Sequence, residues 1–152
     1  ASDVYKRQVL GRIQIKRMPE WHKARLANAN KIWDAAKQLP GLRVPEVPAD
    51  IIHAAYKCYV FVEPTQLKDG WDRDRIMNEI SARGVPAFSG SCSEVYLEKA
   101  FDNTPYRPKE SLPIAKELGE TSLMFLVHPT LSDAEIDKTI AILTEVMQEA
   151  TA

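Results

Sequence analysis

The run of residues best suited to chemistry is Phe88-Ser89-Gly90-Ser91-Cys92-Ser93, in which small polar side chains surround a glycine. Hydroxyl and backbone N–H groups in such a run can donate hydrogen bonds to an oxyanion or a sugar. The run also fits a turn that caps a helix beginning near Glu94, and the two interpretations are compatible. The sequence therefore indicates Ser89, Gly90 and Ser91 as candidate substrate-binding residues.

Other reactive side chains are scattered along the chain. We expect His53 and Tyr96 to frame the same binding mouth. The three histidines (His22, His53 and His128) lie far apart, and none has a second metal ligand at helical spacing. We predict a structural or solvated role for each of them and no metal site. Cys92 has no neighbouring histidine or lysine in the sequence to lower the pKa of its thiol, so we predict no nucleophilic role for it.

Motifs that mark a self-contained active site do not occur in this sequence. It contains no GxGxxG, GxxxxGK[ST], HExxH or GxSxG pattern. The alternating charges of Trp71-Asp72-Arg73-Asp74-Arg75 are typical of a solvated helix start rather than a catalytic cluster. We therefore predict that the chain itself supplies no catalytic residue and no cofactor-binding residue.

Length and composition favour one globular domain and exclude several functions. The 152 residues include 20 basic and 21 acidic side chains, so the clustered positive excess that nucleic-acid binding needs is missing. Apolar stretches such as residues 123–127 are far shorter than a membrane span. Two cysteines without CxxC spacing fit a reducing compartment. We expect a cytoplasmic protein that binds neither nucleic acid nor a membrane.

The N-terminal third predicts helices on either side of a proline. Helical spacing indicates a short helix over residues 9–17, a kink at Pro19 and a longer helix from there to Gln38. The buried stripe of the longer helix is predicted to contain Trp21, Ala24, Ala27, Ile32 and Ala35, with Asn28 as its one polar interruption. Residues 1–8 continue no apolar period and form no obvious turn, and we interpret them as a non-native or artefactual leader.

The remaining elements alternate between strands and helices. Strands are predicted over residues 55–62, 85–88 and 121–127, and helices over 72–84, 94–101, 113–118 and from 132 onward. Ser132 and Glu135 have the spacing of a capping box at the start of the last helix. This order predicts an α+β fold, with a small antiparallel or mixed sheet of about three strands packed with helices and preceded by a long kinked helix.

Four stretches, taken in order, carry a resemblance to a known family. They are Gly11-Arg12-Ile13-Gln14 with Glu20-Trp21, the strand Tyr56 to Phe61, the segment from Arg73-Asp74 to Gly84-Val85, and Pro129-Thr130-Leu131-Ser132 before Glu135-Ile136. Together they span residues 9–150 and resemble the C-terminal part of the DegT/DnrJ/StrS family of sugar aminotransferases, which are fold-type-I pyridoxal-phosphate enzymes.

The resemblance implies that residues 9–150 are the C-terminal small domain of such an enzyme. The Schiff-base lysine, the aspartate at the pyridine nitrogen and the stacking aromatic residue would then lie in a large domain upstream of Leu10. It further implies pyridoxal phosphate in the full-length enzyme, a nucleotide-linked keto-sugar as substrate, glutamate as the usual amino donor and a homodimer. The chain alone would bind no cofactor and be inactive.

Two departures affect the substrate that the resemblance implies. Many family members have a His-Tyr pair followed by proline where this chain has Phe88 to Cys92, which indicates a different sugar pocket. The strand over residues 121–127 contains no arginine, so it offers no bidentate clamp for a carboxylate. Two other hypotheses stay open: a free-standing, non-enzymatic ligand-binding or regulatory α+β domain, and a regulator that keeps the fold without the lysine.

Overall fold

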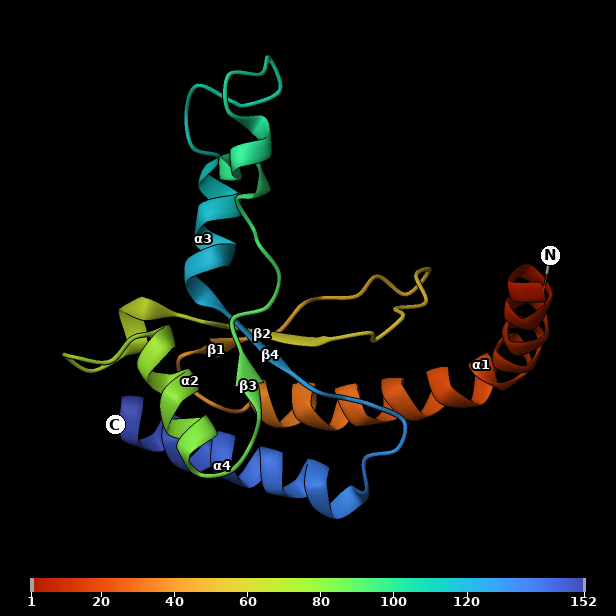
Figure 1. The fold of residues 1–152 in the computed structure, drawn as a ribbon. Helices are drawn as coiled ribbons and strands as arrows, with labels where there is room; N and C mark the ends of the chain where they lie inside the picture. The colour runs from red at the N-terminus through yellow and green to blue at the C-terminus, as the bar shows by residue number, and fades with distance from the viewer. Residues whose placement is uncertain (1, 152) are drawn as a thin grey trace.

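The first helix of the computed structural model, α1 (Ser2–Ala36), is bent (Figure 1), and Pro19 lies inside it. Proline lacks the N–H that would bond one turn back, and its ring collides with the carbonyl of Ile15. The predicted kinked helix is confirmed, but α1 begins at Ser2 and not at residue 9. The structure describes residues 2–151, with side chains from residue 4 on. Ala1 of the leader lies outside these residues, and the interpretation of residues 1–8 as non-native stays a prediction.

Four short strands form one antiparallel sheet in the order β1-β2-β4-β3. They are β1 (Leu42–Arg43), β2 (Cys58–Val62), β3 (Ala87–Phe88) and β4 (Ser122–Phe125). The register pairs Val60 with Leu123 in the middle of the sheet. The predicted α+β architecture is confirmed. The sheet has one strand more than expected, since β1 was not predicted: it is only two residues long and shows no alternation.

Helices cover one face of this sheet and build the core. Figure 1 shows α1, α2 (Arg73–Ala82) and α4 (Asp133–Thr151) on one side. The alternation in β2 sends Cys58, Val60 and Val62 into that core, where they are almost inaccessible to solvent. Other fully buried members are Ile32, Ile76, Ile80, Leu123, Phe125, Ile136, Leu143, Val146 and Met147. Tyr59 and Phe61 of β2 therefore lie on the opposite face.

The buried stripe of α1 is rotated from the predicted one. Asn28, Ala29, Ile32, Trp33 and Ala36 are buried, whereas Ala27 is exposed and the other predicted residues except Ile32 are only half-buried. A hydrogen bond fixes this rotation, because the Nε1 of Trp33 donates to the carbonyl of Tyr59 at 2.9 Å. The contact with β2 therefore determines which residues of α1 are buried.

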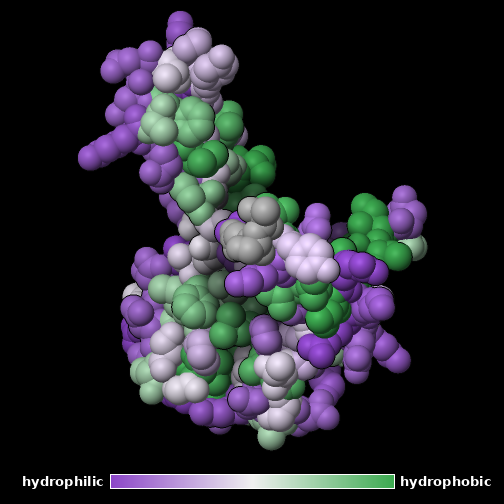
Figure 2. Space-filling view, turned by 45° about the vertical axis from the view of Figure 1, so that its right-hand side comes forward, coloured by the Kyte–Doolittle hydropathy of each residue, from purple (hydrophilic) through white to green (hydrophobic). Residues whose placement is uncertain are grey.

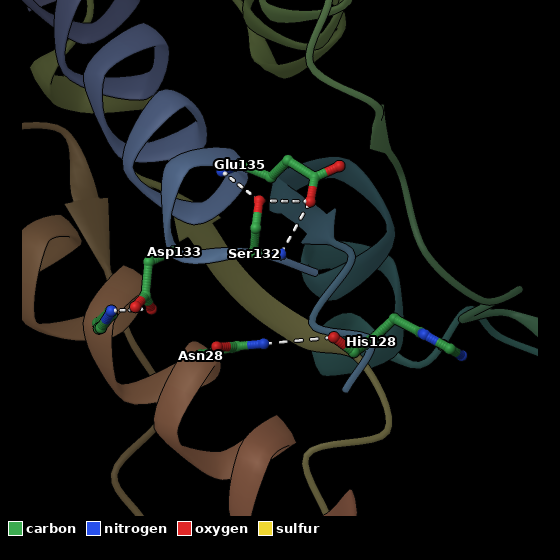
Figure 3. Close-up of polar contacts among 6 residues, drawn as sticks. Asn28, His128, Ser132, Asp133 and Glu135 are labelled. Atoms are coloured by element: carbon green, nitrogen blue, oxygen red, sulfur yellow. Dashed lines mark hydrogen bonds and ion pairs between the residues drawn. The ribbon is translucent and has the colours of Figure 1, made fainter. Parts of the chain in front are cut away.

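The start of α4 is capped and tied to α1 (Figure 3). Both the N–H and the hydroxyl of Ser132 donate to Oε2 of Glu135, at 2.8 and 2.7 Å, which confirms the capping box. Asp133 pairs with Lys31 at 2.6 Å. The Nδ2 of Asn28 donates to the carbonyl of His128 at 3.3 Å, so the polar residue in the stripe satisfies a loop carbonyl.

Asp72 caps the start of α2, and Gly84 follows its end. Oδ1 of Asp72 accepts from the N–H of Arg75 at 2.7 Å. Gly84 follows the helix with a φ of 78°, a left-handed conformation that glycine adopts without steric cost.

Residues 89–121 form an arm that rises from the sheet face opposite the covering helices (Figure 1). It contains two 3-10 helices, Val95–Leu97 and Lys99–Phe101, and α3 (Pro113–Thr121). The sequence predicted that this helix ends at residue 118, just before Gly119, but α3 continues to Thr121. A Cβ at residue 119 would lie 2.3 Å from Oγ of Ser93, so this glycine allows the loop to pass close to the helix.

The described residues contain neither a membrane-spanning helix nor a cluster of metal ligands. None of the helices in residues 2–151 is long and apolar enough to cross a membrane. Within the same part of the chain, no three histidine, cysteine, aspartate or glutamate side chains gather in a group that would hold a metal ion.

Candidate functional site

The run Ser89 to Ser93 passes over the sheet face that the helices leave open. It leaves β3 and is held to β4, because the hydroxyl of buried Ser122 donates to the carbonyl of Ser89 at 2.8 Å. Ser89 and Ser91 are exposed and Gly90 is half-buried. The loop is therefore not a buried cap for the following helix, and its role in substrate binding stays a prediction.

Ser91 is anchored to β2 and to the residue just before it. Nζ of Lys57 donates to Oγ of Ser91 at 3.0 Å. The hydroxyl of Tyr59 lies 3.3 Å from the same oxygen and accepts from the N–H of Ser91 at 3.2 Å. These three residues form one hydrogen-bonded cluster, called here the Lys57–Tyr59–Ser91 cluster.

Gly90 is required by the close approach of the loop to Tyr59. A Cβ at residue 90 would lie 2.5 Å from Cε1 of Tyr59 and 2.9 Å from its hydroxyl oxygen. Its φ of 93° is also a conformation that other residues rarely adopt. The glycine thus lets the backbone lie directly on the tyrosine ring.

Two shallow hollows flank this cluster. The larger has a volume of about 350 Å³ and is lined by His53, Ala54, Ala55, Tyr56, Lys57, Tyr59 and Ser91. The smaller, of about 220 Å³, is lined by Tyr59, Phe61, Ser91, Cys92, Ser93, Leu118 and Ser122. Tyr59 and Ser91 belong to both, so they form the ridge between the two hollows.

His53 lies at the larger hollow, together with Ser91. Its ring is half-buried and meets Trp33 edge-on, with ring centroids 5.4 Å apart. Nδ1 accepts from the N–H of Ala55 at 3.0 Å, and the His53 carbonyl lies 2.9 Å from Nε2 of His22. No residue of the described chain takes the remaining ring nitrogen, Nε2, which leaves it for a ligand or water.

Tyr96 lies elsewhere, inside the arm. It is buried, donates to Oε1 of Glu94 at 2.6 Å and accepts from the N–H of Leu112 at 2.8 Å. Hydrogen bonds from Tyr96 and Ser111 lower the pKa of the Glu94 carboxyl. Tyr96 is not among the residues that line either hollow, so the expectation that it frames the same mouth is corrected: it packs the arm.

Lys57 and Tyr59 were not predicted from the sequence as site residues. The signal was present, since alternation over 55–62 places both side chains on the face opposite the buried one. Cys92 is exposed, and desolvation together with a contact to Glu98 raises the pKa of its thiol, which disfavours thiolate chemistry. Burial raises the pKa of Cys58 to about 12.

Comparison with known proteins identifies the family. Residues 8–144 match the profile of the DegT/DnrJ/EryC1/StrS aminotransferase family. The chain belongs to this family. The family resemblance predicted from the sequence is thereby confirmed over nearly the whole chain.

Solved aminotransferases have the same fold over the length of this chain. The aminotransferase from Psychrobacter cryohalolentis is 54% identical, with a TM-score of 0.85 over 93% of this chain and 38% of its own. TlmJ from Streptoalloteichus hindustanus is 24% identical, with a TM-score of 0.77 over 91% of this chain and 35% of its own. DesV from S. venezuelae, solved with a ketimine intermediate, is 23% identical, with a TM-score of 0.76 over 90% and 34%. This chain therefore spans between a third and two fifths of these proteins.

Pyridoxal phosphate, the cofactor that the family resemblance implies, does not fit the residues around this loop. The cofactor needs a lysine for its Schiff base and an aspartate or arginine at its pyridine nitrogen. Lys57 lines the larger hollow, but its Nζ donates to Ser91, and the lining contains neither an aspartate nor an arginine. These residues do not form a cofactor site by themselves.

Proposed function

We propose that this chain is the C-terminal small domain of a pyridoxal-phosphate-dependent aminotransferase that acts on nucleotide-linked keto-sugars, with glutamate as amino donor. The observation that carries the proposal is the family match over residues 8–144, joined to 54% identity with an aminotransferase of which this chain covers 38%. The cofactor, when bound, supplies the electron sink for transamination. The lysine that holds it would come from the larger domain.

Exposed apolar side chains support a domain that packs against a larger partner. In the first half of α1, Leu10, Ile13 and Met18 are 60%, 44% and 55% exposed. Figure 2 shows further hydrophobic residues on the arm, whose exposed apolar members are Val95, Leu97, Leu112 and Ile114. Apolar surface of this extent is typical of an interface. The large domain and the second subunit of a homodimer are the proposed partners.

The proposed role of this chain in the reaction is to bind and orient the sugar. Ser89 and Ser91 belong to a loop pinned by Ser122 and Tyr59. His53, from the segment before β2, lines the larger hollow together with Ser91. A loop fixed by its own contacts loses little freedom when a ligand binds, so its hydroxyls position the substrate at low entropic cost. A cytoplasmic location belongs to the same proposal, since Cys58 and Cys92 are both free.

The decisive experiment restores the upstream reading frame and compares the longer protein with the 152-residue chain. The longer protein should show the visible band of an internal aldimine and convert a nucleotide-linked keto-sugar to the amino-sugar with glutamate. The chain alone should give no borohydride-reducible adduct with pyridoxal phosphate, because covalent catalysis needs a positioned and activated amine. A stoichiometric adduct on one lysine of the chain, or an upstream frame with no cofactor lysine, would refute the proposal and favour the non-enzymatic alternative.

A further inference from the structure

The Lys57–Tyr59–Ser91 cluster contains more hydrogen-bond donors than it uses. An ammonium group has three N–H donors, and one of those of Lys57 is taken by Ser91. Between Tyr59 and Ser91, one hydroxyl donates to the other, and whichever does so, the second hydroxyl hydrogen stays unused. Two ammonium hydrogens and one hydroxyl hydrogen are therefore available at the ridge between the hollows.

In the described part of the chain, no acceptor group bonds to these three hydrogens, and no carboxylate balances the charge of Lys57. No described carboxylate forms an ion pair with Lys57. The acidic residues that follow in the loop are directed elsewhere, with Glu94 bonded to Tyr96 and Glu98 in contact with Cys92. The lining of the larger hollow contains no aspartate or glutamate at all. The cluster is thus cationic and rich in donors.

This balance favours a phosphate over a neutral sugar as the ligand. A sugar hydroxyl both donates and accepts, so a sugar site normally offers both kinds of partner. Phosphate oxygens only accept, and lysine is a common point-charge partner for them. Hydroxyl groups and a backbone close to the ligand complete such a site, and Gly90 lets the backbone lie close to the cluster.

We propose that the Lys57–Tyr59–Ser91 cluster is a subsite for the diphosphate group of the nucleotide-linked substrate. The inference rests on the proposed function for the identity of the substrate, and on the cluster alone for the chemistry of the ligand. The larger hollow beside Lys57 holds the phosphates, and His53 contributes its Nε2 at the rim of that hollow. The ring of Tyr59 lies beneath Gly90, and whichever hydroxyl of Tyr59 and Ser91 keeps its hydrogen donates it to the phosphate.

The proposal is tested by titrating the 152-residue chain with inorganic pyrophosphate, uridine diphosphate and uridine at constant ionic strength, and following its backbone amides by NMR. Pyrophosphate and uridine diphosphate should shift the amides of Gly90 and Ser91 saturably in the millimolar range, as expected for a few hydrogen bonds on an open surface. Uridine should not. Shifts of these amides by uridine alone, or none by pyrophosphate, would overturn the assignment to phosphate.

Variants separate the subsite from a general effect of positive charge. Lys57→Met should weaken pyrophosphate binding by about tenfold or more, since it removes a charged donor. Lys57→Arg should retain binding within a few-fold. Lys99→Met, which removes the same charge from the exposed surface of the arm, is the matched control and should leave binding unchanged. Equal losses in Lys57→Met and Lys99→Met would contradict a specific site.

Tyr59→Phe keeps the ring beneath Gly90 but removes the hydroxyl that accepts from the N–H of Ser91, so its binding is compared with that of Lys57→Met, which leaves this contact in place. The two proposals can fail independently. Diphosphate binding by the chain, with no transamination by the longer protein, would refute the enzyme and keep the anion subsite. Transamination with an unchanged KM for the nucleotide-sugar in Lys57→Met would refute the subsite and keep the enzyme.

Discussion

Gly90 lies so close to Tyr59 that a Cβ on residue 90 would be 2.5 Å from Cε1 of the tyrosine ring. Gly90→Ala should therefore destabilise the fold by about 1–3 kcal/mol, because alanine is also strained at a φ of 93°. Urea denaturation followed by circular dichroism measures this change.

Gly11→Ala is the matched control for that substitution. Gly11 lies inside α1, and a Cβ there would meet no other atom within 4 Å. Because glycine in a helix costs about 0.5–1 kcal/mol relative to alanine, the control should be neutral or stabilising. Equal effects at the two positions would show that the contact with Tyr59 does not determine the choice of glycine.

The capping box at the start of α4 makes stability depend on pH. Hydrogen bonds from the backbone N–H and the hydroxyl of Ser132 lower the pKa of Glu135 from its ordinary value of 4.5. A carboxyl with a lowered folded-state pKa stabilises the fold above the unfolded value, and this contribution is lost as the pH falls through the folded pKa. Stability should therefore drop on acidification below pH 4.5, in part through this group.

Ser132→Ala should lower stability by about 1 kcal/mol at neutral pH, as expected for the loss of an N-terminal cap. It should also raise the pKa of Glu135 toward 4.5, since one of its two donors is lost. An NMR titration of the Glu135 side chain gives that pKa directly. An unchanged pKa in Ser132→Ala would mean that the cap hydroxyl does not hold the carboxylate.

Local patterns predicted much of this fold, and contacts distant in sequence account for most of the errors. The capping box of Ser132 and Glu135 was predictable because it needs only residues three apart. β1 was missed because two residues carry no alternation, and they pair with β2 only through the tertiary fold. The end of α3 was wrong because Gly119 serves a contact with Ser93, which local helix rules do not include.

The candidate site was predicted only in part, because it also depends on contacts between residues distant in the sequence. The composition of the run Ser89 to Ser91 made this loop a candidate binding site. The alternation over residues 55–62 placed Lys57 and Tyr59 on one face of the predicted strand. Their meeting could not be predicted, because it depends on how the loop after β3 crosses a strand some thirty residues earlier in the chain. Tyr96 was misplaced because a tyrosine next to a polar loop can equally pack inside it.

Asn28 offers a test of how α1 is held to the loop before α4. It is 8% exposed and donates to the carbonyl of His128 at 3.3 Å. Asn28→Ala should cost about 1–2 kcal/mol by leaving that carbonyl without its partner. Asn28→Asp should cost more at pH 7, because a carboxylate would face the carbonyl oxygen.

The Asn28→Asp variant should recover stability on acidification, opposite in direction to the wild type. The introduced carboxyl has a raised folded-state pKa, because only its protonated form can donate to the carbonyl of His128. Its penalty is present above that pKa and disappears as the pH falls through it. Thermal unfolding at pH 7 and pH 4 compares the two proteins, and a parallel loss of stability in both would contradict the assigned hydrogen bond.

The exposed apolar face in the first half of α1 should make the isolated chain self-associate. Leu10 and Ile13 are one helical turn apart and both exposed. Leu10→Gln combined with Ile13→Gln should shift the chain toward monomer in sedimentation velocity without loss of helical content. Lys16→Gln, on the same helix, should leave association unchanged. A wild-type chain that is strictly monomeric at high concentration would contradict an interface here.

The last prediction compares the two serines of the binding loop in the longer enzyme. Within the described part of the chain, the Ser89 hydroxyl has no hydrogen-bond partner, whereas its carbonyl accepts from the hydroxyl of Ser122. Ser89 lines neither hollow, but its proposed role in substrate binding predicts that Ser89→Ala raises KM about 2- to 12-fold, equivalent to 0.5–1.5 kcal/mol for one hydrogen bond. The kcat and the cofactor spectrum should stay unchanged.

Ser91→Ala should raise KM by more, because it removes a ligand contact and also frees Lys57 and Tyr59 from their shared partner. Steady-state kinetics with varied nucleotide-sugar, at saturating amino donor, separates KM from kcat for both variants. A loss confined to kcat, or a shifted cofactor band, would show that the loop acts on the cofactor rather than on the sugar. Wild-type KM in both variants would mean that the loop serves only to hold the arm on the sheet.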